Sequence, residues 1–281
     1  MKKNIFLLAV YLLIGLVSCS EGGQPVSGSG VDIPVVYASR ITMSEQQPND
    51  AATVGLTQSF FYDELDRLTT YLMQQSYTSG EAVEMKDMTV VTYESQQVRV
   101  EDEFGNRLTY TLDAGHGYAV SCLYETVGGS VRRYEFAYTA VGEKYYLCGV
   151  KEFLGDSLEP FSVLSVDYTD DECLVIIKQM NDYTQRFRMQ LTAEGPPNSA
   201  RLPLLFYTEL YPLSQHAVAL YARLLGAAYP VLPLAVILLE NDYEEQCSYR
   251  YKLVDNLPES CIIKFSGRKE SRQINYTFEG V

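Results

Sequence analysis

The dominant pattern in this sequence is a series of short runs in which apolar and polar residues alternate. Tyrosine, valine, threonine and phenylalanine fill these runs, and turn-forming residues separate them. An alternation with a period of two is typical of antiparallel strands that have one face toward water. The pattern predicts hairpins over residues 59–69, 103–111, 136–147, 166–177 and 249–265, and a last strand over 274–278.

The spacing of these hairpins is too irregular for a propeller or a solenoid. A long meander of neighbouring hairpins fits better, so we predict a mostly β protein. The expected fold is a large curved antiparallel sheet or an open barrel of serial hairpins, and the pattern leaves open whether the sheet closes. About 250 residues follow the amino-terminal segment, enough for one sizeable domain, which we place at residues 35–281.

One segment breaks the strand pattern and predicts a single helix near residues 213–225. Pro212 precedes it, Ser214 can cap its first turn, and Gly226 can end it. The helix would be apolar nearly all round, so we expect it to be buried against the sheet. The uncharged run over residues 224–239 is interrupted by glycine and proline, and therefore indicates protein core rather than a membrane span.

The amino-terminal residues have the composition of an export signal. Lys2 and Lys3 precede an uncharged apolar run that is too short to span a bilayer. Residues 1–18 are therefore predicted to be a signal peptide. The order Leu-Val-Ser-Cys that ends at Cys19 resembles the lipobox of bacterial lipoproteins. This resemblance implies cleavage before Cys19 and attachment of lipid, such as palmitate, to that residue.

Residues 19–34 are predicted to be the acylated cysteine and a flexible tether, because glycine and serine dominate them. Two or more acyl chains form a stable membrane anchor. Ser20 stands where some bacteria place an aspartate that keeps a lipoprotein in the inner membrane, so we expect a lipid anchor in the outer membrane. Glu21 is the only acidic residue directly after Cys19, so both a periplasm-facing and a cell-surface position stay open.

The chain is acidic, with a formal net charge of −14. It has no cluster of lysine and arginine that would offset this charge, so we expect no nucleic-acid partner. The acidic balance favours neutral or cationic partners, such as glycans or envelope proteins, over anionic polymers. The membrane itself is a partner through the N-terminal lipid.

Cysteine usage gives no sign of a metal site or a disulfide framework. Free cysteine behaves as a small buried hydrophobe, and most of these cysteines follow or precede apolar or aromatic residues. One disulfide in an oxidising envelope stays possible. Of the 6 cysteines, the five beyond Cys19 are Cys122, Cys148, Cys173, Cys247 and Cys261.

The residue types that perform acid–base and metal chemistry are few or poorly placed. Of the 2 histidines, His116 lies in a Gly-flanked loop and is expected at the surface. His216 falls in the first turn of the predicted helix, where we expect it to be partly buried and hydrogen-bonded. Acidic groups at 101–103, 170–172 and 242–245 are typical of solvated turns, although 170–172 could hold calcium weakly. We predict no catalytic residue, no metal site and no cofactor.

Tyrosine is the abundant recognition residue, with 23 copies and no tryptophan. A tyrosine binds through a flat apolar ring and a hydroxyl, but tyrosines on neighbouring strands more often pack against each other. We favour packing and assign no ligand-binding residue. The tyrosines that could line a binding face are Tyr93, Tyr110, Tyr118, Tyr124, Tyr138 and Tyr168.

Several motifs together resemble a known family. The hairpin Tyr62-Asp63-x-x-x-Arg67-Leu68 looks like a signature of bacterial surface repeats, and Leu-Tyr-Ala-x-Leu-Leu-Gly at 220–226 precedes a Leu-Pro pair at 232–233. With the lipobox, these residues resemble a Bacteroidota lipoprotein family, the domain-of-unknown-function family 4595, which is described as porin-like in fold. The resemblance implies a shape, namely a large curved antiparallel sheet with the helix packed against or inside it, and it implies no activity.

The leading functional hypothesis is therefore a non-enzymatic binding or structural module of the cell envelope. A second hypothesis is a carrier of lipids or amphiphiles, which would use a cavity between sheet and helix. A third is an envelope glycan hydrolase, which would need two carboxylates that face each other across a cleft.

Overall fold

The computed structural model describes residues 36–46, 53–79, 81–169, 172–179, 183–240, 243–268 and 271–279. The predicted signal peptide, Cys19 and the tether over 19–34 lie outside the described residues, as do Asp170, Asp171 and Asp242 of the acidic groups. The predictions that concern them, and the predicted domain limits, stay predictions.

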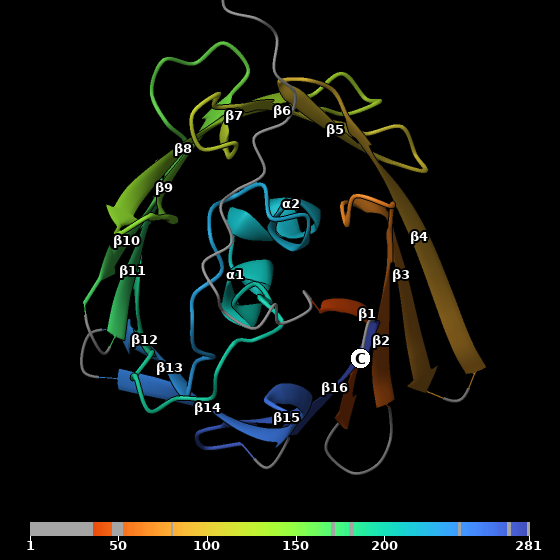
Figure 1. Ribbon diagram of the computed structural model, residues 1–281, viewed down its shortest axis with the longest axis vertical. Helices are drawn as coiled ribbons and strands as arrows, with labels where there is room; N and C mark the ends of the chain where they lie inside the picture. Colours follow the sequence, from red (N-terminus) through yellow and green to blue (C-terminus); the bar gives the residue numbers. More distant parts are fainter. Residues whose placement is uncertain are drawn as a thin grey trace, which may run out of the picture. The chain divides into compact units, whose positions relative to one another are not determined.

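Sixteen strands of the described chain form one antiparallel sheet that closes on itself (Figure 1). Each strand pairs with the next one along the chain, and β1 pairs with β16. The strands are β1 (Tyr37–Gln46), β2 (Thr53–Tyr62), β3 (Leu68–Ser79), β4 (Glu81–Tyr93), β5 (Gln97–Asp102), β6 (Arg107–Leu112), β7 (Ala119–Glu125), β8 (Val131–Val141), β9 (Lys144–Leu154), β10 (Ser162–Tyr168), β11 (Glu172–Gln179), β12 (Thr184–Gln190), β13 (Ala235–Glu240), β14 (Tyr243–Val254), β15 (Leu257–Phe265) and β16 (Ser271–Glu279).

The predicted mostly β meander is confirmed, but the expected open sheet or open barrel is corrected to a closed barrel. Closure depends on the pairing of β1 with β16, in which Ile41 lies opposite Tyr276. Closure leaves no strand with unpaired backbone groups at an edge. Hairpin signals describe only neighbours in sequence, so they contain no information about the pairing of the first strand with the last.

The inner face of the barrel is mainly apolar, and the outer face mixes charged, polar and apolar side chains. In β11, Cys173, Val175 and Ile177 point inward and are buried, whereas the alternate positions face outward. The outer face carries both signs of charge, on strand residues that include Arg40, Glu84, Lys86, Arg99, Glu135, Lys151, Asp167, Lys178, Arg186, Arg250, Lys252 and Lys264. In barrels that cross membranes, the outer face carries an apolar band and the lumen is polar.

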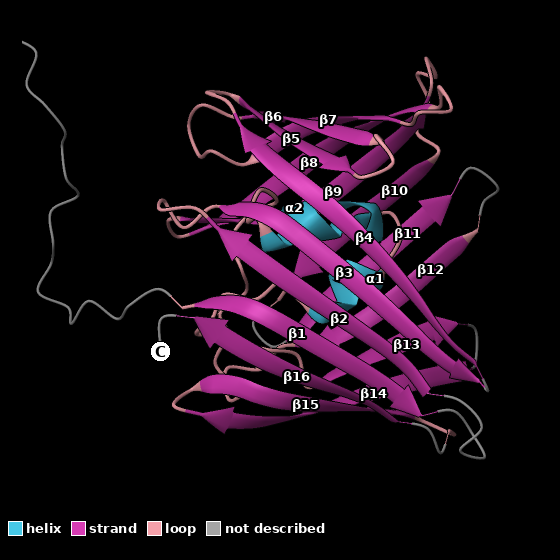
Figure 2. Ribbon diagram, turned by 90° about the vertical axis from the view of Figure 1, so that its right-hand side faces the viewer, coloured by secondary structure: helices cyan, strands magenta, loops and turns pink. Residues whose placement is uncertain are grey.

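Residues 191–234, here called the lumen segment, leave the wall after β12 and return to it at β13. This segment contains α1 (Leu205–Glu209), the 3-10 turn η2 (Leu213–His216) and α2 (Ala217–Tyr221). Figures 1 and 2 show α1 and α2 within the ring of strands. No helix in the described part of the chain has the length and apolar character needed to cross a membrane.

The predicted single helix over residues 213–225 is corrected in extent and in number. Helical structure within it ends at Tyr221 and is split into a 3-10 turn and an α-helix, and α1 was not predicted. Ser214 makes no capping bond, because Pro212 rather than Ser214 lies at the start of the helical stretch. The expected burial is confirmed, since Leu213 and Ala219 are both 0% exposed.

Backbone contacts fasten the lumen segment to the wall. The Ala119 N–H donates to the Leu224 carbonyl at 2.8 Å, and the Ala227 N–H donates to the Tyr145 carbonyl at 2.8 Å. Between these contacts, Gly226 adopts a φ of 93°. A β-carbon there would lie 3.0 Å from the Tyr145 carbonyl oxygen, so only glycine permits this close approach.

Candidate functional site

A cavity of about 460 Å³ opens where the lumen segment meets the rim of the barrel. It lies at the end of the barrel where β1 begins, because the alternating strand directions put the end of β12 and the start of β13 there. A smaller pocket of about 40 Å³ continues inward from it and shares the two arginines and residues 226–229 with it. We call both together the mouth pocket; its principal lining residues are Tyr118, Lys144, Tyr168, Arg201, Arg223 and Tyr229.

The two arginines of the mouth pocket both have left-handed backbone conformations. The φ angle is 52° at Arg201 and 59° at Arg223. For a residue with a β-carbon this conformation costs roughly 1–2 kcal/mol, and it persists only where the surroundings enforce it. Two such residues on one cavity indicate that local backbone strain is concentrated there.

The surroundings that enforce these conformations are identifiable. Asn198 is buried, and its side-chain amide donates to the carbonyls of Leu202 at 2.8 Å and Tyr229 at 2.9 Å. Its side-chain oxygen accepts the Leu202 N–H at 2.9 Å, which fixes the turn that contains Arg201. Arg223 follows the end of α2, where the Leu224 N–H bonds the Ala219 carbonyl at 2.9 Å. Glycine is the usual residue at that position of a helix end.

The mouth pocket is positively charged although the chain is acidic. Within the described residues, neither Arg201 nor Arg223 forms an ion pair with a carboxylate, and Lys144 adds a third cation to the lining. The Arg223 guanidinium instead lies over the Tyr37 ring, 4.6 Å from its centroid. Burial lowers the pKa of Arg223 from its usual value; Tyr37 opposes this shift and the charge of Arg201 adds to it.

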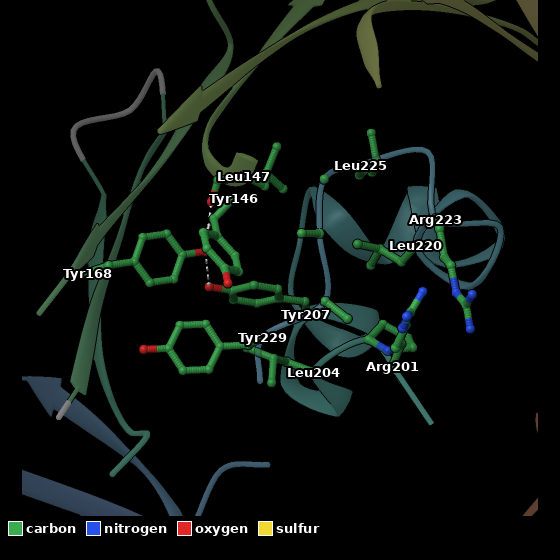
Figure 3. Close-up of a pocket in the computed structure, with 14 residues that line it drawn as sticks. Tyr146, Leu147, Tyr168, Arg201, Leu204, Tyr207, Leu220, Arg223, Leu225 and Tyr229 are labelled. Carbon is green, nitrogen blue, oxygen red and sulfur yellow. Dashed lines mark hydrogen bonds between the residues drawn. The ribbon is translucent and has the colours of Figure 1, made fainter. Parts of the chain in front are cut away.

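Fixed aromatic rings form the side of the pocket that faces these cations. The rings of Tyr168 and Tyr229 are stacked, with centroids 5.8 Å apart and planes 12° apart. Tyr146 packs against both rings. The Tyr168 hydroxyl donates to the Leu147 carbonyl at 2.8 Å. Figure 3 shows Tyr168 and Tyr229 on one side of the pocket, Arg201 and Arg223 on the other, and Tyr207 and Leu204 between them.

The structure separates the tyrosines named from the sequence. Tyr118 and Tyr168 line the mouth pocket. The others point into the barrel and pack there, as the favoured interpretation held: Tyr110 is 0% exposed, and the remaining three are Tyr93, Tyr124 and Tyr138. Sequence reasoning missed Arg201, Arg223 and Tyr229, because isolated arginines in a loop give no periodic signal.

The two histidines occupy different environments. His116 belongs to the loop at the rim of the barrel, where its ring packs against those of Tyr118 and Tyr145, so it is more enclosed than a surface loop residue. His216 is hydrogen-bonded, as predicted, but fully rather than partly buried. Its Nδ1 lies 2.8 Å from the Tyr110 hydroxyl, and its Nε2 has no partner among the described residues.

A second buried polar cluster surrounds Glu152 on β9. This carboxylate is 0% exposed and lies 2.6 Å from the Arg132 guanidinium. Ser162 donates to it at 2.9 Å, and the hydroxyls of Tyr134 and Tyr211 also bond it. Tyr211 belongs to the lumen segment, so the cluster joins that segment to the wall.

Other candidate chemistry is not assembled into a site. The described residues contain no group of three or more His, Cys, Asp or Glu side chains that could hold a metal ion. Glu101 and Glu172 of the acidic turns pair with Arg107 and Arg188 instead. The cysteines other than Cys19 form no disulfide bond within the described residues. Cys122, Cys173 and Cys261 are buried, as the sequence interpretation held, and Cys148 and Cys247 are half-buried.

A closed antiparallel barrel with a chain segment inside its lumen defines a porin-like class of fold. The chain belongs to the family of domains of unknown function with porin-like fold, DUF4595, whose model matches residues 60–257. This confirms the family resemblance found in the sequence motifs.

Two solved structures share the fold. A porin-like protein from Bacteroides uniformis is 32% identical, with a TM-score of 0.77, and the match covers 88% of this chain and 98% of that one. A porin-like protein from Bacteroides vulgatus is 12% identical, with a TM-score of 0.53 and coverage of 88% and 100%, and shows the fold alone. No curated protein matches this chain.

Proposed function

We propose that the protein is an outer-membrane-anchored lipoprotein whose barrel stands in water and binds a ligand at the mouth pocket, without catalysis. The observation that carries this proposal is the polarity of the barrel: its outer face carries charged residues on many strands, and its interior is mainly apolar and occupied by the lumen segment. A membrane-embedded pore needs the reverse arrangement. A lipid on Cys19 would therefore supply the membrane attachment that the barrel surface does not.

The composition of the mouth pocket favours binding over the hydrolase hypothesis. Glycoside hydrolysis uses two carboxylates placed on either side of the scissile bond. The residues that line the mouth pocket in the described chain include no aspartate or glutamate. The pocket does have the volume and the mixture of rings and polar groups that small-molecule sites have. A glycan or a segment of an envelope protein fits these dimensions, and the periplasmic and cell-surface positions both satisfy the proposal.

Cell fractionation tests the anchor and the polarity of the barrel together. The wild-type protein is expected in the outer-membrane fraction. A variant in which residues 1–19 are replaced by a signal peptide that is cleaved without acylation is expected among the water-soluble envelope proteins. Retention of this variant in membranes after an alkaline carbonate wash would show that the barrel itself is embedded. If mass spectrometry finds no acyl group on the wild-type protein, the proposed lipid anchor is refuted.

A second candidate function, amphiphile binding, is favoured by an apolar cavity of about 420 Å³ elsewhere in the lumen. It lies between α1 and the wall strands β12 to β16. Arg272 lines it, paired with Glu209 at 2.6 Å and with Glu45 at 3.2 Å. The apolar residues around it include Phe187, Phe206, Leu210, Val236, Leu238 and Phe265.

Filling this cavity tests the second candidate. If the cavity holds an acyl chain, Leu238→Trp is expected to abolish binding of a fluorescent fatty acid, because Leu238 lines the cavity. The control is Leu239→Trp, since the neighbouring side chain points to the other face of β13. Equal titration curves for the wild type and both variants would exclude the cavity as an acyl site.

A further inference from the structure

Arg201 and Arg223 differ from the other arginines of the described chain in what surrounds them. Some arginines are paired with acids, namely Arg67, Arg99, Arg107, Arg132, Arg188 and Arg272. Others, such as Arg186 and Arg250, extend from the outer face into water. Arg201 and Arg223 instead line a cavity, and no carboxylate of the described residues neutralises them.

The backbone at these two positions does not explain the choice of arginine. Both residues have positive φ angles, where glycine is free of steric cost. The same segment uses glycine at Gly226, where a positive φ also occurs. A strained arginine in place of an available glycine indicates that the side chain itself is required, and strained residues of this kind concentrate at binding sites.

The rings opposite the arginines restrict what the ligand can be. Tyr229 lines both parts of the mouth pocket and is held in a stack with Tyr168, and a fixed tyrosine face takes up flat or ring-shaped ligands with apolar surface. Guanidinium groups bind carboxylate, sulfate and phosphate through parallel N–H donors. A ligand that satisfies both sides of the pocket carries a ring and an oxyanion.

We propose that the mouth pocket binds an acidic sugar, with Arg201 and Arg223 on its carboxylate, sulfate or phosphate group and the tyrosines against its ring. This proposal rests on the proposed function and names the ligand class of the same pocket. It departs from the expectation of neutral or cationic partners, which was drawn from the net charge of the whole chain. Charges on the outer surface are screened within about 8–10 Å at physiological salt, whereas the two guanidinium groups touch the ligand.

Calorimetric titration with a matched pair of probes tests the charge requirement. Digalacturonic acid carries the carboxylates, and its dimethyl ester has the same rings without the charge. We expect the acid to bind at least tenfold more tightly than the ester. Inorganic sulfate and phosphate are expected to bind far more weakly than the acid. Binding of these ions as tight as that of the acid would show an anion site without sugar recognition and overturn the proposal.

Substitution by glycine separates binding from folding. Arg201→Gly and Arg223→Gly relieve the backbone strain, so we expect melting temperatures no lower than that of the wild type, with at least a tenfold loss of affinity for the acid. Arg250→Gln, on the outer face, is the control and should bind as the wild type does. Unchanged affinity in both glycine variants would overturn the proposal.

The acidic-sugar assignment and ligand binding at the mouth pocket are contradicted by different results. Equal binding of the acid and the ester would refute the acidic-sugar assignment and leave ligand binding at the mouth pocket intact. No binding of either sugar probe would count against both the acidic-sugar assignment and the proposed function of the pocket.

Discussion

Replacing Glu152 with alanine is expected to lower the free energy of unfolding by about 3 kcal/mol. Removing one partner of a buried ion pair costs roughly 3–5 kcal/mol, because the other charge is left uncompensated. The lower end applies here, since the Arg132 side chain is 37% exposed and can partly turn to water. Ser162 and the hydroxyls of Tyr134 and Tyr211 lose an acceptor at the same time.

Urea titration of purified protein measures this effect. Glu135→Ala is the matched control, because Glu135 lies on the neighbouring strand β8 but faces outward, and surface changes usually stay within about 0.5 kcal/mol. Tyr211→Phe removes the hydroxyl that bonds Glu152 and accepts from Arg132 at 3.1 Å, but it leaves the ion pair intact, so a smaller loss is expected from it. A midpoint for Glu152→Ala equal to that of Glu135→Ala would mean that the cluster does not stabilise the fold.

Local features of this fold follow from the sequence because they depend on neighbouring residues. The turn after β2 is an example. Asp63 accepts the Leu65 N–H at 3.0 Å and the Arg67 N–H at 2.9 Å, and its other oxygen pairs with the Arg67 guanidinium at 2.7 Å. Aspartate prefers turns for this reason, and the Tyr-Asp motif therefore predicts the hairpin here.

Features that depend on distant residues could not be predicted from the sequence. Glu152 sits in an alternating strand between Lys151 and Phe153. One of its partners, Tyr211, lies 59 positions away along the chain. The closure of β1 on β16 is of the same kind, with Ile41 opposite Tyr276.

The residues of the mouth pocket, too, could be predicted only in part from the sequence. Tyr118 and Tyr168 could be named from the sequence, because tyrosine in strands and loops is a recognisable recognition residue. Arg201 and Arg223 could not, since their significance depends on left-handed backbone angles and on a cavity that forms only when residues 197–201 meet 223–230. The net charge of the chain does not describe the local charge of this pocket, because it averages over all residues.

The fold is expected to lose about 2 kcal/mol of stability between pH 7 and pH 5 because of His216. Burial lowers the pKa of His216 to about 3. In the unfolded chain the pKa of histidine is about 6.5, so the unfolded state takes up a proton in this range while the folded state does not. The neutral imidazole therefore stabilises the fold above pH 6.5, and this contribution is lost progressively as the pH falls toward 3.

The cause of this shift is the environment of the ring. His216 is 1% exposed, and the rings of Tyr134 and Phe136 meet it edge-on, with centroids 4.3 and 5.2 Å away. No carboxylate of the described residues pairs with it, so a proton on Nε2 would place an uncompensated charge in the core.

Urea midpoints of His216→Phe at pH 7, 6 and 5 test this origin. Phenylalanine keeps an aromatic ring in the same place, so the variant should lose stability at pH 7 through the missing Tyr110 bond but show a flatter pH profile. His116→Phe, at the rim, is the control for the removal of a histidine. Burial raises the pKa of Asp87, which acts in the opposite direction, but Asp87 is present in all three proteins. The difference between the His216→Phe and wild-type slopes therefore isolates His216, and parallel profiles would mean that its ring titrates as it does in water.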